Sequence, residues 1–147
     1  MKTIKDTDYG DLTGKKYTGN IDLYKQGIES MEGFPDMITG DLLMQGNNLK
    51  SLKGSPRYVG GDCYFDTNDI ESLEGAPKEI GGKFSCQRNY VKNSIEQICK
   101  YQIKATGYFI SEQNNVVEFE EIEEQFNNFK LNNRVTRPSM RKLLGLK

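Results

Sequence analysis

The side chains in this 147-residue chain best suited to nucleophilic chemistry are its three cysteines, Cys63, Cys86 and Cys99. A thiol becomes a good nucleophile only where a neighbouring base or cation lowers its pKa. The chain contains no histidine, which excludes histidine-dependent triads, histidine-ligated zinc or haem, and histidine acid–base catalysis. A cysteine nucleophile would therefore need a lysine or arginine beside it. An odd number of cysteines without a C-x-x-C pair predicts neither a disulfide framework nor a zinc site, and favours a reduced, cytoplasmic environment.

Carboxylates beside glycines are the second group of residues with chemical potential. A TGD and a GGD triplet end at Asp41 and Asp62, and a pair of aspartates could bind calcium or serve acid–base catalysis. A third triplet, GGK, places Lys83 at the equivalent position, and no further ligands accompany it. The chain also lacks the common nucleotide-binding and hydrolase motifs. We therefore expect a protein that is not an enzyme and that holds no metal or cofactor.

The spacing of these triplets belongs to a repeat of 21 residues in the middle of the chain. Three full units follow an incomplete unit at 18–27. Five sets of residues recur at this step: Pro35, Pro56 and Pro77; Gly33, Gly54 and Gly75; Gly40, Gly61 and Gly82; Ile38, Val59 and Ile80; and Asn47, Asn68 and Asn89. A fixed period of this length is typical of a solenoid, in which every repeat forms one turn.

The segment around each asparagine resembles the L-x-L-x-x-N-x-L strand of leucine-rich repeats. In the second unit this segment runs from Leu42 through Asn47 to Leu49. The rest of the unit, S-h-x-G-x-P-x-x-h-G-G, is similar to the short, proline-bearing bacterial variety of the repeat. It is also similar to repeats in small uncharacterised proteins of tailed bacteriophages. The resemblance covers about residues 17–95 and implies the repeat fold, in a family that binds very diverse partners.

The alternation of residues within each unit agrees with this resemblance. Leu42 and Met44 point the same way from a short strand, so stacked turns form a parallel sheet over one continuous core. Cys63 and Cys86 occupy equivalent inward positions and are expected to act as small core residues. The three asparagines should form a ladder of amides bonded to backbone groups. The predicted fold class is α/β: a leucine-rich-repeat-like solenoid of about three to four turns with a short parallel sheet, followed by a helical C-terminal cap.

The segments on either side of the repeat are expected to cap its ends. Residues 1–16 are polar and predict a ragged, partly ordered N-terminal cap before a solenoid at 17–93. After the solenoid, S-x-x-Q beginning at Ser94 has the form of a capping box and predicts a helix over about 94–105. The sequence ATGYFI at 105–110 predicts a turn and a short strand. Residues 94–147 are assigned to the helical C-terminal cap and a basic tail.

The last third of the chain leaves two interpretations open. Phenylalanines recur at helical spacing within 116–131, between glutamates, and predict an amphipathic helix. This helix either packs against the end of the solenoid or binds a partner. The tail at 132–147 carries basic residues and no acidic ones. It either pairs with the acidic helix or makes weak, salt-sensitive contacts with nucleic acid.

Side chains that alternate with the core positions should form columns across the concave face of the sheet. Stacking does not require large apolar residues there, yet Tyr24, Leu43 and Tyr64 occupy three of these positions. Aromatic residues surrounded by aspartates are typical of a binding surface for a basic or amphipathic protein. The alternative is that scattered exposed apolar residues have no function. The candidate protein-binding site comprises Tyr24, Leu43, Tyr64, Asp41, Asp62, Asp66 and Arg88.

The overall composition narrows the function further. A net charge of −1 argues against a whole-domain footprint for nucleic acid or anionic membranes, and no segment resembles a membrane span or a signal peptide. We expect a cytoplasmic, non-enzymatic protein-interaction module. The resemblance to phage proteins implies an accessory protein that binds and inhibits or modulates a bacterial host or defence protein. The alternatives are a structural virion or assembly component, and weak nucleic-acid association through the basic tail.

Overall fold

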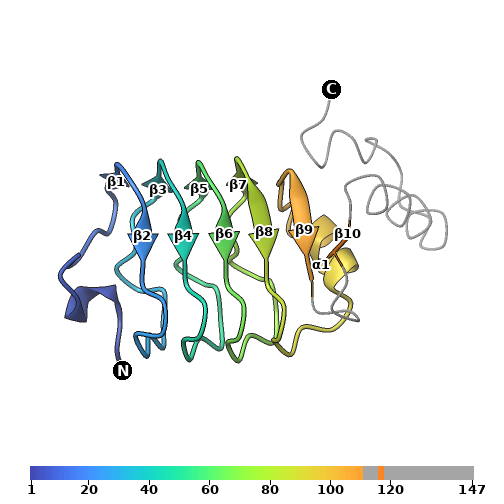
Figure 1. Ribbon diagram of the computed structural model, residues 1–147, viewed down its shortest axis with the longest axis horizontal. Coiled ribbons are helices and arrows are strands. Elements are labelled where there is room, and N and C mark those ends of the chain that lie inside the picture. The colour runs from blue at the N-terminus through green and yellow to red at the C-terminus, as the bar shows by residue number, and fades with distance from the viewer. Residues whose placement is uncertain (111–115, 118–147) are drawn as a thin grey trace.

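The computed structural model describes residues 1–110 and 116–117, which coil into a solenoid of about four turns (Figure 1). Each turn contributes one very short strand to each of two sheets. The four-stranded sheet has the order β1 (Lys16–Tyr17), β3 (Met37–Ile38), β5 (Tyr58–Val59) and β7 (Glu79–Ile80). The six-stranded sheet has the order β10 (Val116–Val117), β9 (Gly107–Phe109), β8 (Lys83–Ser85), β6 (Cys63–Tyr64), β4 (Leu42–Leu43) and β2 (Ile21–Asp22).

The register of the sheets follows the period of the sequence. Leu42 pairs in parallel with Ile21 on one side and with Cys63 on the other, each one repeat unit away. The same step relates Ile38 to Val59 in the other sheet. The parallel-strand solenoid predicted from the repeat is therefore confirmed.

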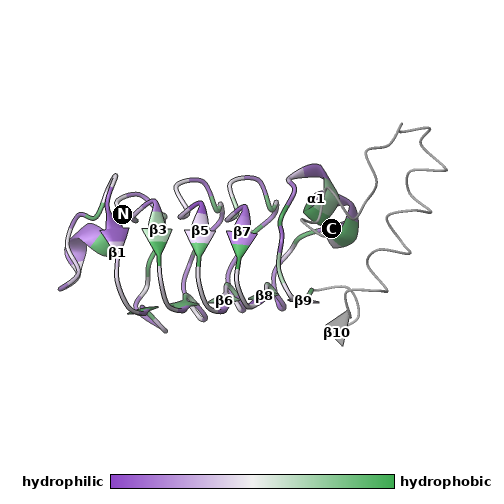
Figure 2. Ribbon diagram, turned by 90° about the horizontal axis from the view of Figure 1, so that it is seen from above, coloured by the Kyte–Doolittle hydropathy of each residue, from purple (hydrophilic) through white to green (hydrophobic). Residues whose placement is uncertain are grey.

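The four-stranded sheet is a second side of the stack that the sequence analysis does not predict. Figure 1 looks onto the six-stranded sheet and Figure 2 looks onto the four-stranded one, so the two sheets form adjacent sides of each turn. The inward residues of the four-stranded sheet, Ile38, Val59 and Ile80, are buried. They are visible in the repeat, but the positions two residues before and after each of them are charged residues or glycines, so no alternating apolar pattern marks a strand.

The core between the two sheets is continuous along the stack, and an asparagine ladder runs beside it. Leu42, Met44 and Phe65 are all fully buried within this single cluster. Asn68 shows how each rung of the ladder works: its Oδ1 accepts from the Leu49 amide at 3.0 Å, and its Nδ2 donates to the Met44 and Phe65 carbonyls. The predicted ladder is confirmed, and it supplies buried backbone groups of consecutive turns with partners.

The stack is close to straight in both views, so the predicted concave face is not present as a curved surface (Figures 1 and 2). Strands in a sheet lie about 4.8 Å apart, whereas packed helices need about 8–10 Å. A solenoid curves when one side carries the wider elements. Here the turns from β1 to β8 carry strands in both of the adjacent sheets and no wider element in either, so the turns keep one spacing on these two sides.

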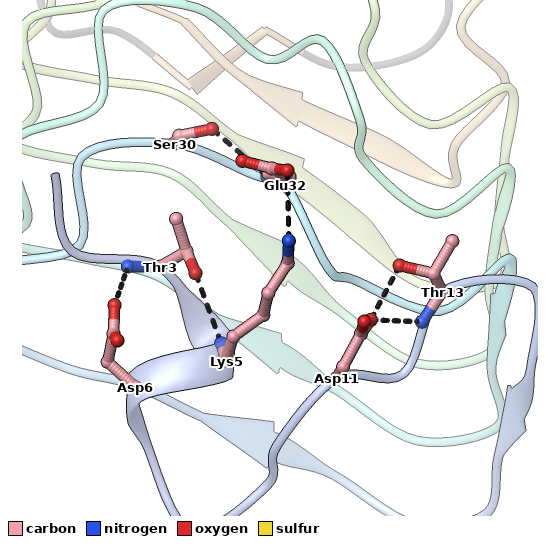
Figure 3. A network of polar contacts seen from close by, with 7 residues as sticks. All are labelled: Thr3, Lys5, Asp6, Asp11, Thr13, Ser30 and Glu32. Atoms are coloured by element: carbon pink, nitrogen blue, oxygen red, sulfur yellow. Dashed lines mark hydrogen bonds and ion pairs between the residues drawn. The ribbon is translucent and has the colours of Figure 1, made fainter.

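Residues 1–16 form a more regular N-terminal cap than their polar composition predicts. The 3₁₀ helix η1 (Ile4–Asp6) begins in a capping box, in which the Thr3 amide donates to Asp6 Oδ2 at 2.9 Å (Figure 3). Ile4 is fully buried. The Lys5 ammonium donates to Glu32 Oε1 at 2.9 Å, and this hydrogen bond raises the pKa of Lys5. The cap is therefore tied to the first repeat unit.

Helix α1 (Ser94–Lys100) is shorter than the helix predicted over 94–105, and it lacks the predicted capping box. Its N-cap residue, Asn93, has left-handed backbone and makes no capping hydrogen bond through its side chain. The Gln97 side chain instead accepts from the Leu73 amide and donates to the Lys92 carbonyl, each at 2.7 Å. The capping-box prediction is wrong because this glutamine ties the helix to the preceding turn.

After α1 the chain returns to both sheets in a final, longer turn. Lys104 forms an isolated bridge with Glu79, and Tyr108 pairs with Phe84, a step of 24 residues. The strand predicted within 105–110 is thus confirmed as β9. Val116–Val117 form β10, antiparallel to β9, where the sequence predicts the start of a helix. The rest of that predicted helix and the basic tail at 132–147 lie outside the described residues.

Candidate functional site

The candidate residues lie on the outer surface of the six-stranded sheet, which we call the six-strand face. Leu43 and Tyr64 are direct neighbours on β4 and β6, and both are partly exposed. Tyr24 follows β2 and is 51% exposed, and Lys25 Nζ lies 5.2 Å from the centre of its ring. The three side chains expected to meet a partner therefore occupy consecutive turns of one face.

The aspartates of the candidate site also hold the stack together. Asp41 Oδ1 accepts a hydrogen bond from the Asp62 amide at 2.7 Å, and Asp62 Oδ1 accepts from the Lys83 amide at 2.8 Å. In the first turn Asn20 Oδ1 plays the same part for the Asp41 amide. Each carboxylate thus uses one oxygen to accept a hydrogen bond from the next turn, a structural role that the sequence pattern did not indicate.

This aspartate ladder explains the glycine column that precedes it. A Cβ added at Gly61 would overlap Asp41 Oδ1, and one added at Gly82 would overlap Asp62 Oδ1. The carboxylate reaches the next amide only because the residue before that amide is a glycine. The T/G-G-D pattern therefore joins consecutive turns of the stack.

Asp66 and Tyr64 are likewise engaged within the face. Asp66 Oδ1 accepts from the Ser85 hydroxyl at 2.6 Å and from the Gln87 amide at 2.7 Å, and this contact accompanies burial of Ser85. The Tyr64 hydroxyl donates to Asp62 Oδ2 at 3.3 Å. Partial burial, together with the charge of Asp62, raises the pKa of Tyr64. The phenol therefore stays protonated and acts as a hydrogen-bond donor at neutral pH.

Arg88 belongs to a column of left-handed backbone at the edge of the face. Lys25, Thr67 and Arg88 have φ values of 51°, 58° and 56°, and Gly46 takes the equivalent place in the second turn with a φ of 73°. Glycine adopts this conformation without strain, whereas other residues do so at a cost of about 1–2 kcal/mol. Three turns thus carry an exposed side chain where glycine would fit more easily.

Phe109 is a residue of the six-strand face that sequence reasoning missed. It pairs with Ser85 and extends the row of Leu43 and Tyr64 to β9, and Lys83 Nζ lies 5.5 Å from the centre of its ring. Phe109 lies 24 residues after Ser85, its partner in the sheet, so the 21-residue period does not identify it. The signal that could have found it is the alternation in β9, where buried Tyr108 stands between outward residues.

The three cysteines are buried, and for Cys63 and Cys86 this confirms the prediction from their positions in the repeat. Burial raises the pKa of the Cys63 thiol well above its usual value, and that of Cys86 rises for the same reason. A buried, protonated thiol is a poor nucleophile. Within residues 1–110 and 116–117, no three side chains of cysteine, aspartate or glutamate gather into a group suited to a metal ion.

No family model, curated protein or solved structure matches this chain. The resemblance to leucine-rich repeats and to phage repeats therefore rests on the repeat pattern itself. In the described part of the chain, every helix falls short of the length and apolar character that crossing a bilayer demands.

Proposed function

We propose that this chain is a non-enzymatic protein-interaction module that binds its partner with the six-strand face. The observation that carries this proposal is the presence of large side chains in three consecutive turns of this face: Tyr24, exposed just after β2, and Leu43 and Tyr64, partly exposed on β4 and β6. Tyr24, Leu43 and Tyr64 make no contribution that stacking requires, because the neighbouring aspartates and the inner ladder already join the turns. Tyrosines in such positions are the residues that most often dominate binding energy at protein interfaces.

The left-handed column at the edge of the face supports the same proposal. Residues held in strained backbone conformations concentrate at binding sites, because there the side chain contributes more to binding than the backbone strain costs. Lys25, Thr67 and Arg88 all project from this column beside the aromatic row. They would form the polar rim that surrounds the centre of an interface.

The charges of the face favour a basic or amphipathic partner. Asp22, Asp41, Asp62 and Asp66 lie in the first three turns, together with Lys25, whereas Lys83 and Arg88 lie in the fourth. Opposite charges at the two ends orient an incoming partner and increase its rate of association. The likeness to repeats of bacteriophage proteins makes a bacterial host or defence protein, bound and inhibited or modulated in the cytoplasm, the first partner to test.

The proposal is tested by affinity capture from a bacterial lysate with the full-length chain. A variant carrying Tyr24→Ala, Leu43→Ala and Tyr64→Ala is compared with a control carrying Lys50→Ala, Glu71→Ala and Lys92→Ala. The control residues are exposed and lie three residues after each asparagine of the inner ladder, in the loops that we call the loop side of the stack. We expect the control to retain the partner and the aromatic variant to lose it. The purified partner should then bind the aromatic variant at least about tenfold more weakly. An unchanged set of captured proteins would refute the proposal.

A further inference from the structure

The outer surface of the four-stranded sheet, which we call the four-strand face, is predominantly basic. Its columns contain five cations, Lys15, Lys16, Arg57, Lys78 and Lys104, and two carboxylates, Asp36 and Glu79. A groove of about 320 Å³ crosses this face, lined by Asp36, Met37, Arg57, Tyr58, Lys78 and Glu79. Figure 2 looks directly onto β3, β5 and β7, which carry this groove. The feature is separate from the six-strand face and from every residue assigned above.

The cations of this face differ in how they are engaged. Lys78 Nζ donates to the Tyr101 carbonyl at 2.8 Å, and Lys104 Nζ lies 3.9 Å from Glu79 Oε1. Among the described residues, the Arg57 guanidinium has neither a hydrogen bond nor an ion pair, although Asp36 precedes it in the same column by one turn. Arg57 is exposed in the middle of the groove. Lys15 and Lys16 likewise make no side-chain hydrogen bond or ion pair within the described residues, but they lie outside the groove. Within the groove, Arg57 is therefore the cation that is ready to receive an anion from outside.

The neighbours of Arg57 supply an apolar surface beside that charge. Tyr58 and Met37 are adjacent in register on β5 and β3, and both are half-buried. Arginine, tyrosine and methionine are the residue types enriched at the centres of protein interfaces. The guanidinium also matches a carboxylate in a planar, two-pronged hydrogen-bonding geometry. We propose that this groove binds an acidic peptide segment of a partner protein, with a carboxylate on Arg57 and an apolar side chain on Tyr58 and Met37.

The two carboxylates of the groove distinguish an acidic peptide from a nucleic acid. Asp36 and Glu79 lie one turn before and one turn after Arg57. A phosphate backbone is negative at every unit and would be repelled by both carboxylates. A peptide can place a neutral or basic residue opposite each of them and reserve its own carboxylate for Arg57. The charge pattern thus favours a protein partner.

The test uses the full-length chain and fluorescence anisotropy with three labelled probes. These are a peptide of alternating glutamate and phenylalanine, a matched peptide of alternating lysine and phenylalanine, and oligothymidylate. We expect the acidic peptide to bind and the basic peptide to fail. Arg57→Glu should weaken binding of the acidic peptide by about tenfold or more, and Tyr58→Ala by several-fold. Lys92→Glu, which makes the same type of charge change on the loop side, should leave it unchanged.

Four results would overturn the proposal. The acidic peptide fails to bind, or it binds Arg57→Glu as well as the original chain while circular dichroism and the urea midpoint show both to be folded. Oligothymidylate binds more tightly than the acidic peptide and displaces it, which assigns the groove to nucleic acid. Replacing the five glutamates of 118–124 by glutamine strengthens peptide binding by tenfold, which assigns the groove to the chain's own acidic run.

Discussion

The two sheets of this solenoid are built from the same repeat, yet they use their polar side chains in opposite ways. On the six-strand face, Asp41 and Asp62 each accept a hydrogen bond from the amide of the next turn through one carboxylate oxygen. On the four-strand face, Arg57 has no such partner within the described residues and stands exposed in a groove. The carboxylates of the six-strand face bind backbone amides of the next turn, whereas the guanidinium of the four-strand face is available to bind a ligand.

The difference is visible in how strictly each column repeats. Positions that join turns recur almost unchanged, such as the glycine before each aspartate and the inner asparagine of each unit. The columns of the four-strand face vary in sign and size: Asp36, Arg57 and Lys78 follow one another in one column. Variation within a repeat therefore marks positions that stacking does not constrain. Those are the positions from which a binding surface can be made.

The largest expected effect comes from the inner ladder that supports the six-stranded sheet. Asn68→Ala removes the acceptor for the Leu49 amide and the donor for the Met44 and Phe65 carbonyls, all in buried or partly buried surroundings. We expect the free energy of unfolding to fall by about 3 kcal/mol. Urea denaturation measures this change, and Asn48→Ala, at an exposed side chain, is the matched control. A loss no larger than that of the control would contradict the role of the ladder.

The aspartate ladder should contribute less to the free energy of unfolding than the asparagine ladder, because it lies nearer to solvent. Asp41→Ala leaves the partly buried Asp62 amide without its acceptor and should cost about 1–2 kcal/mol in unfolding free energy. Asp41→Asn should restore most of that loss, because Asn20 already performs this function in the first turn. Both values come from the same urea experiment. If the asparagine variant is as unstable as the alanine variant, the charge matters rather than the hydrogen bond.

A substitution in the left-handed column is expected to increase the stability of the fold, unlike the two changes above. Thr67→Gly relieves a β-branched residue at a φ of 58°, and we expect it to stabilise the fold by about 1 kcal/mol. The reverse change, Gly46→Ala, should destabilise it by a similar amount. Thermal denaturation followed by circular dichroism distinguishes the two. A destabilised Thr67→Gly variant would mean that the threonine side chain supports the stack, and would contradict its assignment to the polar rim of the interface.

The smallest effect on stability is expected on the four-strand face. Arg57→Ala should change the free energy of unfolding by less than about 0.5 kcal/mol, since an exposed side chain without partners contributes little. The same substitution should weaken binding of the acidic peptide. A loss of stability comparable to that of Asp41→Ala would erase the contrast between the two faces.

The sequence predicts the solenoid well because the features that build it are local and repeated. The 21-residue step of asparagine, glycine and aliphatic residues determines the turn, the register and the buried face, and Asn68 and Cys63 lie where that step places them. Two features escape this logic. Each strand of the four-stranded sheet has a single inward apolar residue and so shows no alternation, and the final step of 24 residues places Phe109 out of register with the 21-residue period.

The candidate site was predicted in position but only partly in role. Tyr24 is exposed and Leu43 is partly exposed, on the outward side where alternation places them. Asp41 and Asp62 were expected to face solvent, but each side chain is long enough to reach the amide of the next turn. These hydrogen bonds depend on the distance between consecutive turns in space, and the pattern of residue types does not indicate that distance. The straightness of the stack follows in the same way from the unpredicted second sheet.

The most direct test of the proposed binding face is amide hydrogen exchange of the full-length chain with and without its captured partner. Binding by the six-strand face predicts slower exchange in three consecutive turns, at peptides covering 22–26, 43–47 and 64–68, and unchanged exchange on the loop side around 50–53 and 71–74. Protection confined to the loop side, or absent from all three turns, would contradict the account.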